Sequence, residues 1–468
     1  MSYKISKDQI EALKLHLGKG TAVFCPGDQG YEEGLKRWSD VASRPAGVVL
    51  LPDNAEDIGK VVRFAKDNHL DLAVKCGGHS TDSSSSSDGG ISINLARLNK
   101  VRVDPLAKTV TVQGGALWED VNNAAAQFDL AVIGGTESQI GVGGLTLRGG
   151  NGFLTPQYGM VIDSLISAQV VVADGRQLTA SEKVNPDLFW ALRGAGQCVG
   201  LAVEFTFRAH PQENDVWAGI VTFSGDKLAS VVEVLDIISK HPGGKAAVLC
   251  AIAICPNTHV PLVNIVIFFN GSESDGRRHF APLLDLGYTA FDVSMKPYRD
   301  VPAMLNAAAP PGGRKFSGGI LFNSPLRPTL VCKLVDELKH KIEIEPRMGE
   351  SSIQMDCIDL SAAVRVPITS TAFPSRHLLV NAALVLQWTD EIRDTEMIKW
   401  ASEVKDMCDA ELKREGNERS SLVSNFVSYT QETKVTPGEM FGVNAEKLLE
   451  TKKQYDPDNV FCKLNPLY

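Results

Sequence analysis

Two glycine-rich segments in the first third of the chain have the clearest potential for chemistry. Gly77 and Gly78 precede His79 in the segment CGGHS, after a short apolar run, and GVGGLTLRGGNG spans residues 141–152. Glycines let backbone N–H groups approach a pyrophosphate without clashes from Cβ atoms, and consecutive N–H groups can form an anion-binding nest. Either segment alone is a weak signal, so their meaning depends on the elements that position them.

A nicotinamide-binding Rossmann domain is not favoured by the third glycine run. The Rossmann fingerprint follows a strand, opens a helix and is answered by an acidic residue about twenty positions later. The nearest match in spacing is Gly194, Gly196 and Gly200, which leave a predicted helix and enter the strand LAVEFTFRAHP. This order is the reverse of the fingerprint.

The elements around the first two glycine segments are predicted to alternate between strand and helix. A strand at 47–51, a helix capped by Asn54 and a second strand at 70–76 form a βαβ unit. Two hairpins follow, one with its turn at Asp104-Pro105 and one at Asp174-Gly175. The stretch 134–152 is predicted to be a long ordered loop with a functional role.

The pattern changes after residue 211, where longer helices alternate with apolar strands. We therefore predict a first domain at 1–210, a second at 211–420, and a C-terminal segment at 421–468 that returns to the first domain. A length of 468 residues is ample for two packed domains.

The composition is that of an ordinary globular protein, with 44% hydrophobic and 22% charged residues. A formal charge of −9 and the lack of a basic cluster disfavour nucleic acid as a partner. No apolar stretch is long enough to cross a bilayer, and the N-terminus lacks the features of a signal peptide, so a cytoplasmic location is expected. The nine cysteines are scattered, which predicts free thiols, and the nine dispersed histidines predict no metal site.

Four segments occur in the order found in one family of flavoproteins. They are VKCGGHSTDSSSSSDGGISINL, GGTESQIGVGGLTLRGGNGFLTPQYG, DLFWALRGAGQCVG and the terminal YDPDNVF. The chain thereby resembles the vanillyl-alcohol oxidase and berberine-bridge-enzyme family, densely over 45–210, thinly near the C-terminus and weakly across 211–420. The resemblance implies an α+β fold with a PCMH-type FAD-binding domain and a substrate domain built on an antiparallel sheet covered by helices.

His79 is where the family's flavin-linking histidine falls. A neutral imidazole can attack the 8-methyl carbon of an oxidised flavin; the alternative is a loop histidine that hydrogen-bonds a phosphate. Many relatives make a second link through the cysteine of a Gly-Thr-Cys-Pro stretch, which here reads Gly135-Thr136-Glu137-Ser138. Glu137 cannot form that thioether, so a single covalent link to FAD is predicted.

The remaining cofactor contacts are carried over from the family in the same way. The residues predicted to bind FAD are Lys75, Cys76, Gly77, Gly78, His79, Ser80, Gly135, Thr136, Glu137, Gly141, Gly143, Gly144, Gly149, Gly150, Gly152, Gly200, Val203 and Asn465.

Three residues are candidates for catalysis. Tyr429 matches a tyrosine that serves as base in relatives, although Met440-Phe441-Gly442 replaces their Tyr-Tyr-Gly segment, and Tyr429 could instead be a packing residue. Asn381 and Gln387 share one face of the strand LLVNAALVLQW, where they would contact substrate or flavin, or cap neighbouring backbone groups.

The predicted activity is oxidation of a small alcohol, amine or secondary metabolite. Hydride would pass to flavin N5, and molecular oxygen would accept the electrons and give hydrogen peroxide. The alternatives are a dehydrogenase insensitive to oxygen, an oxidative or redox-neutral cyclase, and a flavin-binding protein without turnover.

Overall fold

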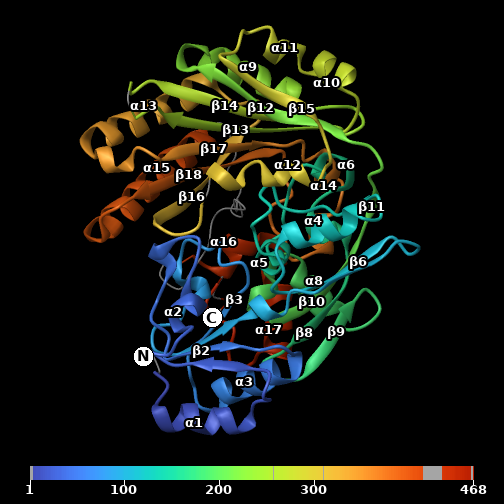
Figure 1. Cartoon of the computed structure of the whole chain (residues 1–468), viewed down its shortest axis with the longest axis vertical. Coiled ribbons are helices and arrows are strands. Elements are labelled where there is room, and N and C mark those ends of the chain that lie inside the picture. The colour runs from blue at the N-terminus through green and yellow to red at the C-terminus, as the bar shows by residue number, and fades with distance from the viewer. Residues whose placement is uncertain (1–3, 257, 309, 415–434, 465–466, 468) are drawn as a thin grey trace.

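The computed structural model is an α+β protein with a seven-stranded sheet above two smaller sheets (Figure 1). It describes residues 4–464 and 467, apart from 257, 309 and 415–434. Within these residues no helix has the length and apolar character needed to cross a membrane.

The first sheet carries the first glycine segment at the end of one strand. Its order is β1 (Ala22–Phe24), β2 (Val48–Leu51), β4 (Ile91–Asn94) and β3 (Leu72–Lys75), with β2, β4 and β3 parallel. Helix α3 (Ala55–Asp67) connects β2 to β3, and the Asn54 side chain caps it by accepting the N–H of Asp57 at 2.8 Å. The predicted βαβ unit is therefore confirmed, with β4 placed between its two strands. Helix α1 (Lys7–His16) packs against α3.

The second sheet is antiparallel and holds both predicted hairpins. Its order is β5 (Val101–Asp104), β6 (Thr109–Gln113), β10 (Leu201–Arg208), β8 (Leu165–Val171) and β9 (Gln177–Ser181). Helices α4 (Trp118–Ala126) and α8 (Pro186–Ala195) share one hydrophobic core with this sheet, which includes the buried rings of Trp118, Phe205 and Phe207. Strands β7 (Leu130–Ala131) and β11 (His210–Pro211) pair separately.

The second glycine segment is not the continuous loop that the sequence predicts. Residues Val142–Leu147 form the short helix α5, which packs against α8, and α6 (Thr155–Tyr158) and α7 (Val161–Ser164) follow. The loop prediction is wrong over α5 because Val142, Thr146 and Leu147 bury their side chains on one side of a helical turn. Glycine content alone therefore understated the regularity of this stretch.

The third sheet is antiparallel throughout and lies in residues 216–388. Its order is β15 (Ala290–Lys296), β12 (Val216–Ser224), β14 (Pro261–Phe269), β13 (Ala246–Ile254), β17 (Ser352–Cys357), β18 (Leu379–Trp388) and β16 (Arg314–Asn323). Helices cover its outer face, among them α9 (Leu228–Ile238), α13 (Pro328–Ile344) and α15 (Asp394–Arg414) (Figure 1). The shorter helices of this part are α10 (Glu273–His279), α11 (Ala281–Leu284), α12 (Asp300–Ala303) and α14 (Ser361–Val364).

The inner face of the third sheet is turned toward the glycine segments. On β18, Ala382, Leu384 and Leu386 belong to the core beneath the helices, whereas Ala383 and Val385 pack against Trp38 from the N-terminal region. Alternation along a strand places Asn381 and Gln387 on that inner face as well.

The described C-terminal residues pack against the first region of the chain. Helix α17 (Ala445–Tyr455) contacts α8, and α16 (Pro437–Phe441) precedes it. Lys452 and Asp456 form a fully buried ion pair at 2.5 Å, and Asp456 also accepts the N–H groups of Val460 and Phe461 at 2.8 Å. This network fixes the YDPDNVF segment. The domain limits drawn from the sequence stay a prediction.

Candidate active site

The two glycine segments touch each other through their backbones. A Cβ atom on Gly77 would lie 2.5 Å from the Gly141 nitrogen, and one on Gly141 would lie 2.4 Å from the Gly77 nitrogen. A Cβ on Gly143 would meet the Cys76 sulfur at 2.8 Å, whereas one on Gly144 would meet no atom within 4 Å. Glycine is therefore required where the segments meet, and the space beside the Cα atom of Gly144 is open.

Two buried cations lie beside the first glycine turn. Arg37 is 5% exposed and Lys75 is 9% exposed, and a Cβ on Gly78 would lie 2.9 Å from the Lys75 side chain. Desolvation lowers the pKa of Lys75 to about 8 and that of Arg37 to about 10. Within the part of the chain that the structure describes, neither has an ion-pair partner. Buried cations of this kind fit an anionic group such as a diphosphate.

The His79 ring is held against Trp38. The two rings stack with centroids 5.5 Å apart and planes 16° from parallel. Lys315 lies on β16 of the third sheet, and its ammonium is 4.6 Å from the Trp38 ring centroid. Desolvation and, next, the Lys315 charge lower the pKa of His79 to about 4. The imidazole is therefore neutral and nucleophilic at physiological pH.

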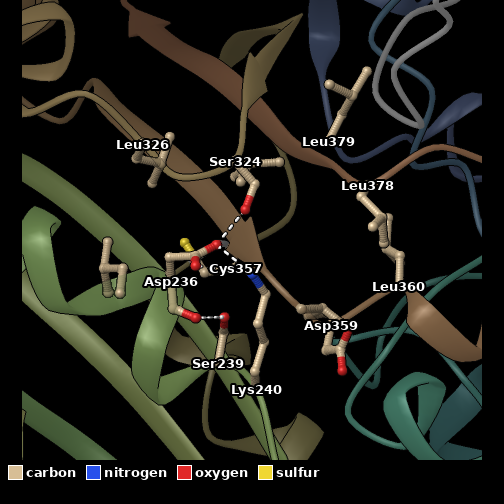
Figure 2. A pocket seen from close by; sticks show the side chains of 13 residues that line it. Asp236, Ser239, Lys240, Ser324, Leu326, Cys357, Asp359, Leu360, Leu378 and Leu379 are labelled. Carbon is tan, nitrogen blue, oxygen red and sulfur yellow. Dashed lines mark hydrogen bonds and ion pairs between the residues drawn. The ribbon is translucent and has the colours of Figure 1, made fainter.

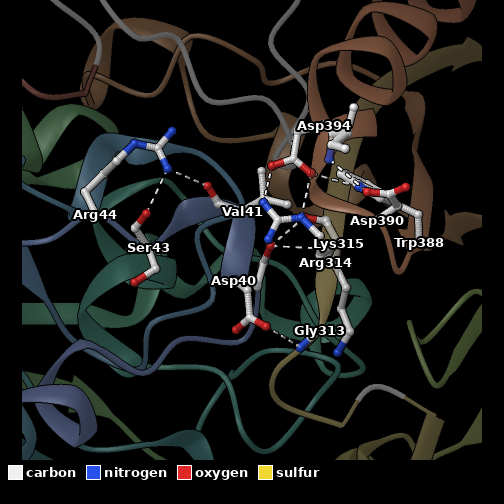
Figure 3. Close-up of polar contacts among 12 residues, drawn as sticks. Asp40, Val41, Ser43, Arg44, Gly313, Arg314, Lys315, Trp388, Asp390 and Asp394 are labelled. Carbon is white, nitrogen blue, oxygen red and sulfur yellow. Dashed lines mark hydrogen bonds and ion pairs between the residues drawn. The ribbon is translucent and has the colours of Figure 1, made fainter.

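Polar contacts join the N-terminal region to the start of β16 (Figure 3). The Asp40 N–H donates to the Gly313 carbonyl at 3.0 Å, and the Gly313 N–H donates to the Asp40 carboxylate at 3.0 Å. Arg314 forms an ion pair with Asp394, which also accepts the Trp388 indole N–H at 2.9 Å. The position of Lys315 beside Trp38 is thus fixed from both sides.

The inner face of the third sheet places a carboxyl group opposite the glycine segments. Asp356 on β17 pairs in register with Asn381 on β18, and Gln354 lies two residues earlier on the same face. The Asn151 side chain, from the second glycine segment, donates to the Asp356 carboxylate at 3.4 Å. Desolvation and, to a smaller degree, the charge of Glu137 raise the pKa of Asp356 to about 7. A carboxyl group with this pKa can exchange a proton near neutrality.

Glu137 is a second acidic group in the same region. Its pKa is raised by desolvation, while a hydrogen bond with Gln139 and the charge of Lys315 act in the opposite direction. The charge of Glu137 therefore acts on the pKa of both Lys315 on β16 and Asp356 on β17.

Three further glycines of the second segment, also predicted to contact the cofactor, shape the backbone of that segment. Gly149 and Gly150 adopt left-handed backbone conformations, with φ of 105° and 73°. Cβ positions at these two glycines are filled by Phe373 and Val161, and that of Gly152 lies 2.0 Å from the Gly134 carbonyl oxygen. These glycines turn and pack the chain beneath the open Gly144.

Several further predicted residues form part of the surrounding framework. Ser80 donates to Asp82 at 3.0 Å, and Val203 is buried on β10, where its carbonyl accepts the Gly114 N–H at 2.8 Å. Gly200 packs against Val170 on β8. Gly135 and Thr136 immediately precede Glu137. Their roles toward a cofactor stay a prediction.

The candidate catalytic residues have different surroundings. Asn381 is 8% exposed and lies beside Asp356. Gln387 lies near the other end of β18, where its side chain donates to the Glu350 carbonyl at 3.1 Å, so the capping alternative describes its contact. Tyr429 and Asn465 lie outside the described residues.

Sequence reasoning missed Asp356, Trp38 and Lys315. Asp356 lies in SIQMDC, whose alternation of polar and apolar residues indicates a strand with one polar face. That alternation was a usable signal for the strand. Its partner strands are set by pairings between distant segments, so the sequence did not reveal what the polar face meets.

A separate small pocket lies between the end of α9 and the ends of β16 and β17 (Figure 2). Lys240 forms an ion pair with Asp236 at 2.8 Å, Ser324 donates to the same carboxylate, and the third charged group, Asp359, accepts hydrogen bonds from Ser361. Cys357 also lines this pocket and alternates with Asp356 along β17. The pocket therefore opens on the side of the sheet away from the candidate site.

Two family models match parts of the chain. The model described as an FAD binding domain matches residues 46–181, and the model described as berberine and berberine like matches residues 425–465. The first match contains both glycine segments.

Relatives match along nearly the whole chain. The FAD-linked oxidoreductase pgmH of Aspergillus terreus is 29% identical over 99% of this chain and 96% of its own length. The (R)-6-hydroxynicotine oxidase of Paenarthrobacter nicotinovorans is 27% identical over 94% of each chain.

Solved structures agree in fold. The 6-hydroxy-D-nicotine oxidase of Arthrobacter nicotinovorans superposes with a TM-score of 0.81 at 25% identity, covering 95% of this chain and 96% of that one. A berberine bridge enzyme variant in complex with (S)-reticuline has a TM-score of 0.82 at 17% identity, with 99% of each chain covered. The predicted α+β fold is confirmed.

The chain is an FAD-dependent oxidoreductase that carries an FAD binding domain and a berberine-like C-terminal segment, and its matches are consistent with the vanillyl-alcohol oxidase and berberine-bridge-enzyme family. The glycine segments in contact, the open space beside Gly144 and the buried cations at Arg37 and Lys75 fit FAD, whose diphosphate carries the matching negative charge.

Proposed function

We propose that this protein is an oxidase in which FAD is bonded to His79 and a small alcohol, amine or secondary metabolite is oxidised at the inner face of the third sheet. Molecular oxygen would accept the electrons and give hydrogen peroxide. The observation that carries the proposal is Asp356, a carboxyl group with a pKa of about 7 on the sheet face opposite the glycine segments. The name of the related hydroxynicotine oxidase supports an oxidase over other flavoprotein activities.

The bound flavin supplies the acceptor for a hydride from the substrate carbon. Asp356 then has the role of general base, which takes the O–H or N–H proton from the same substrate. Asn151 orients this carboxylate through the 3.4 Å hydrogen bond, and Asn381 and Gln354 offer amide groups to the substrate from the same face. Fixing the reacting groups on a rigid sheet lowers the entropic cost of reaching the transition state.

The single covalent link is supported by the chemistry of two residues. His79 is neutral because burial and Lys315 disfavour its protonated form, so a ring nitrogen has a free lone pair for bonding to carbon. Glu137 occupies the position of the cysteine that forms the second link in relatives. A carboxylate there cannot form a thioether, which leaves His79 as the sole attachment point.

The proposal is tested by replacing the base. Asp356→Asn is expected to lower kcat/KM by about 100-fold or more, because general base catalysis typically contributes that much, while bound FAD stays at the wild-type amount. The matched control is Asp359→Asn, whose carboxylate accepts hydrogen bonds from Ser361 outside the sheet face. Unchanged kcat/KM in Asp356→Asn would show that the base lies elsewhere, with Tyr429 as the next candidate.

The pH dependence follows from the raised pKa of Asp356. Below about pH 7 the carboxyl group is protonated and cannot accept a proton, so activity is expected to fall as the pH decreases through that value. This acidic limb should be absent from the residual activity of Asp356→Asn. Steady-state kinetics across the pH range measure both profiles.

The acceptor is tested by mixing the substrate-reduced enzyme with oxygen in a stopped-flow instrument. Rapid return of the oxidised flavin spectrum with formation of hydrogen peroxide supports an oxidase. Slow return with full activity toward an artificial acceptor supports a dehydrogenase, and turnover without net flavin reduction supports a redox-neutral cyclase. No flavin reduction by any alcohol or amine supports a flavin-binding protein without turnover.

A further inference from the structure

The segment that carries Trp38 lies between the His79 loop and the third sheet. The Trp38 N–H donates to the Gly78 carbonyl at 3.0 Å, and the Trp38 carbonyl accepts the Gly312 N–H at 3.1 Å. The next residue, Ser39, donates its hydroxyl to the Lys315 carbonyl at 2.5 Å. Trp38 therefore touches the proposed flavin-linking residue on one side and the start of β16 on the other.

A second contact joins the same loop directly to β16. The Ser317 N–H donates to the Thr81 hydroxyl at 3.2 Å, two residues after His79. The His79 ring thus stacks on Trp38, and the loop that carries it is hydrogen-bonded to the sheet through Thr81. β16 therefore supplies part of the enclosure around His79.

Lys315 is an unusual residue to bury at this point. It is 3% exposed, and its ammonium donates to the Pro310 carbonyl and lies over the Trp38 ring. The carboxylates of Asp40, Glu350 and Glu137 act on it through electrostatic attraction, yet desolvation dominates and lowers its pKa. Burying a cation is costly, so its retention beside His79 calls for a role.

We propose that Trp38 and Lys315 are positioning residues that hold the His79 ring in place for bonding to FAD, so that covalent attachment depends on docking of the third sheet. This inference rests on the proposed bond to His79. In that step an imidazole nitrogen bonds to the 8-methyl carbon of the flavin. The methyl group and the imidazole each lose one proton, and the two electrons and two protons pass to molecular oxygen, giving hydrogen peroxide.

The charge of Lys315 has a specific consequence for this step. A cation near His79 disfavours the imidazolium form, which has no lone pair for bonding to carbon. The other charged groups around the loop are Arg37 and Asp82, which attract each other, and Glu137 beyond Lys315. Removing the Lys315 charge is therefore expected to move the pKa of His79 toward the ordinary histidine value.

The experiment follows covalent attachment in the full-length chain, produced without flavin in a riboflavin-starved host and then mixed with FAD. Acid-stable flavin is measured over time, together with total bound flavin. Lys315→Met and Trp38→Leu are expected to attach FAD at least about tenfold more slowly, with total binding unchanged, because misplacement of a reacting group by about 1 Å can lower a rate by up to about 100-fold. Lys315→Arg and Trp38→Phe should restore attachment.

The matched control for charge is Lys333→Met on the exposed surface of α13, which should attach FAD at the wild-type rate. The pH profile separates positioning from simple structural support. Wild-type attachment should be constant between about pH 8 and 5.5, whereas attachment in Lys315→Met should begin to decrease at a higher pH than in the wild type, because loss of the charge raises the pKa of His79.

Attachment at the wild-type rate in both Lys315→Met and Trp38→Leu would overturn the inference while leaving the bond to His79 intact. If these variants fail to fold, the wild-type profile decides, because a decrease with a midpoint near the ordinary histidine pKa would overturn the role of Lys315. Absence of acid-stable flavin in the wild type would overturn the proposed bond and this inference together.

Discussion

The cofactor side of the site is built mainly from backbone, whereas the substrate side is built from side chains. At the cofactor side, Gly77 and Gly141 are in direct contact and leave no space for a Cβ atom. At the proposed substrate side, Asp356, Gln354 and Asn381 project from a regular sheet whose backbone needs no particular residue at these positions. We therefore expect the cofactor site to tolerate few substitutions, and the sheet face to change its side chains without disturbing FAD.

The largest effect is expected where the two glycine segments meet. Gly141→Ala would place a methyl group 2.4 Å from the Gly77 nitrogen, so the segments must move apart. We expect the free energy of unfolding to fall by about 1–3 kcal/mol, as for other overpacked sites, and most bound FAD to be lost. Thermal unfolding and the ratio of flavin to protein absorbance measure the two effects.

Gly144→Ala sharpens this comparison. Its new methyl group meets no protein atom within 4 Å, so the stability of the flavin-free protein should match the wild type. If the cofactor passes beside Gly144, the affinity for FAD should nevertheless decrease. Equal flavin content in Gly141→Ala and the wild type would contradict the expectation that the cofactor side is the less tolerant of the two sides of the site.

A smaller and different effect is expected on the substrate side. Gln354→Leu removes an amide from the inner face of the third sheet, and KM should rise about 2- to 10-fold, which is the value of one lost hydrogen bond. Flavin content and the fraction bound covalently should not change. Steady-state kinetics and the visible spectrum provide the measurements.

The neighbouring residue offers a matched control for that variant. Met355 is buried on the opposite face of β17, toward the helices, so Met355→Leu should leave KM unchanged and alter stability by less than about 1.5 kcal/mol. A larger change in KM for Met355→Leu than for Gln354→Leu would contradict the assignment of the inner face to substrate.

Local signals predicted much of the first region. The Asn54 cap, the hairpin turn at Asp174-Gly175 and the strand before Gly77 are all present, because each depends on a few adjacent residues. Helix α5 was missed, since its glycines have low helix propensity and tertiary packing on α8 overrides that preference.

The substrate side could be predicted only in part. Alternation along one strand correctly separated the two faces of β18 and placed Asn381 toward the interior. Asp356 lies beside Asn381 because β17 pairs with β18. Lys315 reaches Trp38 from β16, which pairs with the other edge of β18. Such pairings join residues far apart in sequence, so no local pattern reveals them. The role of Tyr429 stays a prediction.

The bond between FAD and His79 is the central claim, and acid precipitation of the purified protein tests it most directly. We predict that the yellow colour stays with the wild-type precipitate and is released into solution by His79→Ala. Release of the flavin from the wild-type protein would contradict the claim and would leave His79 as a non-covalent neighbour of the cofactor.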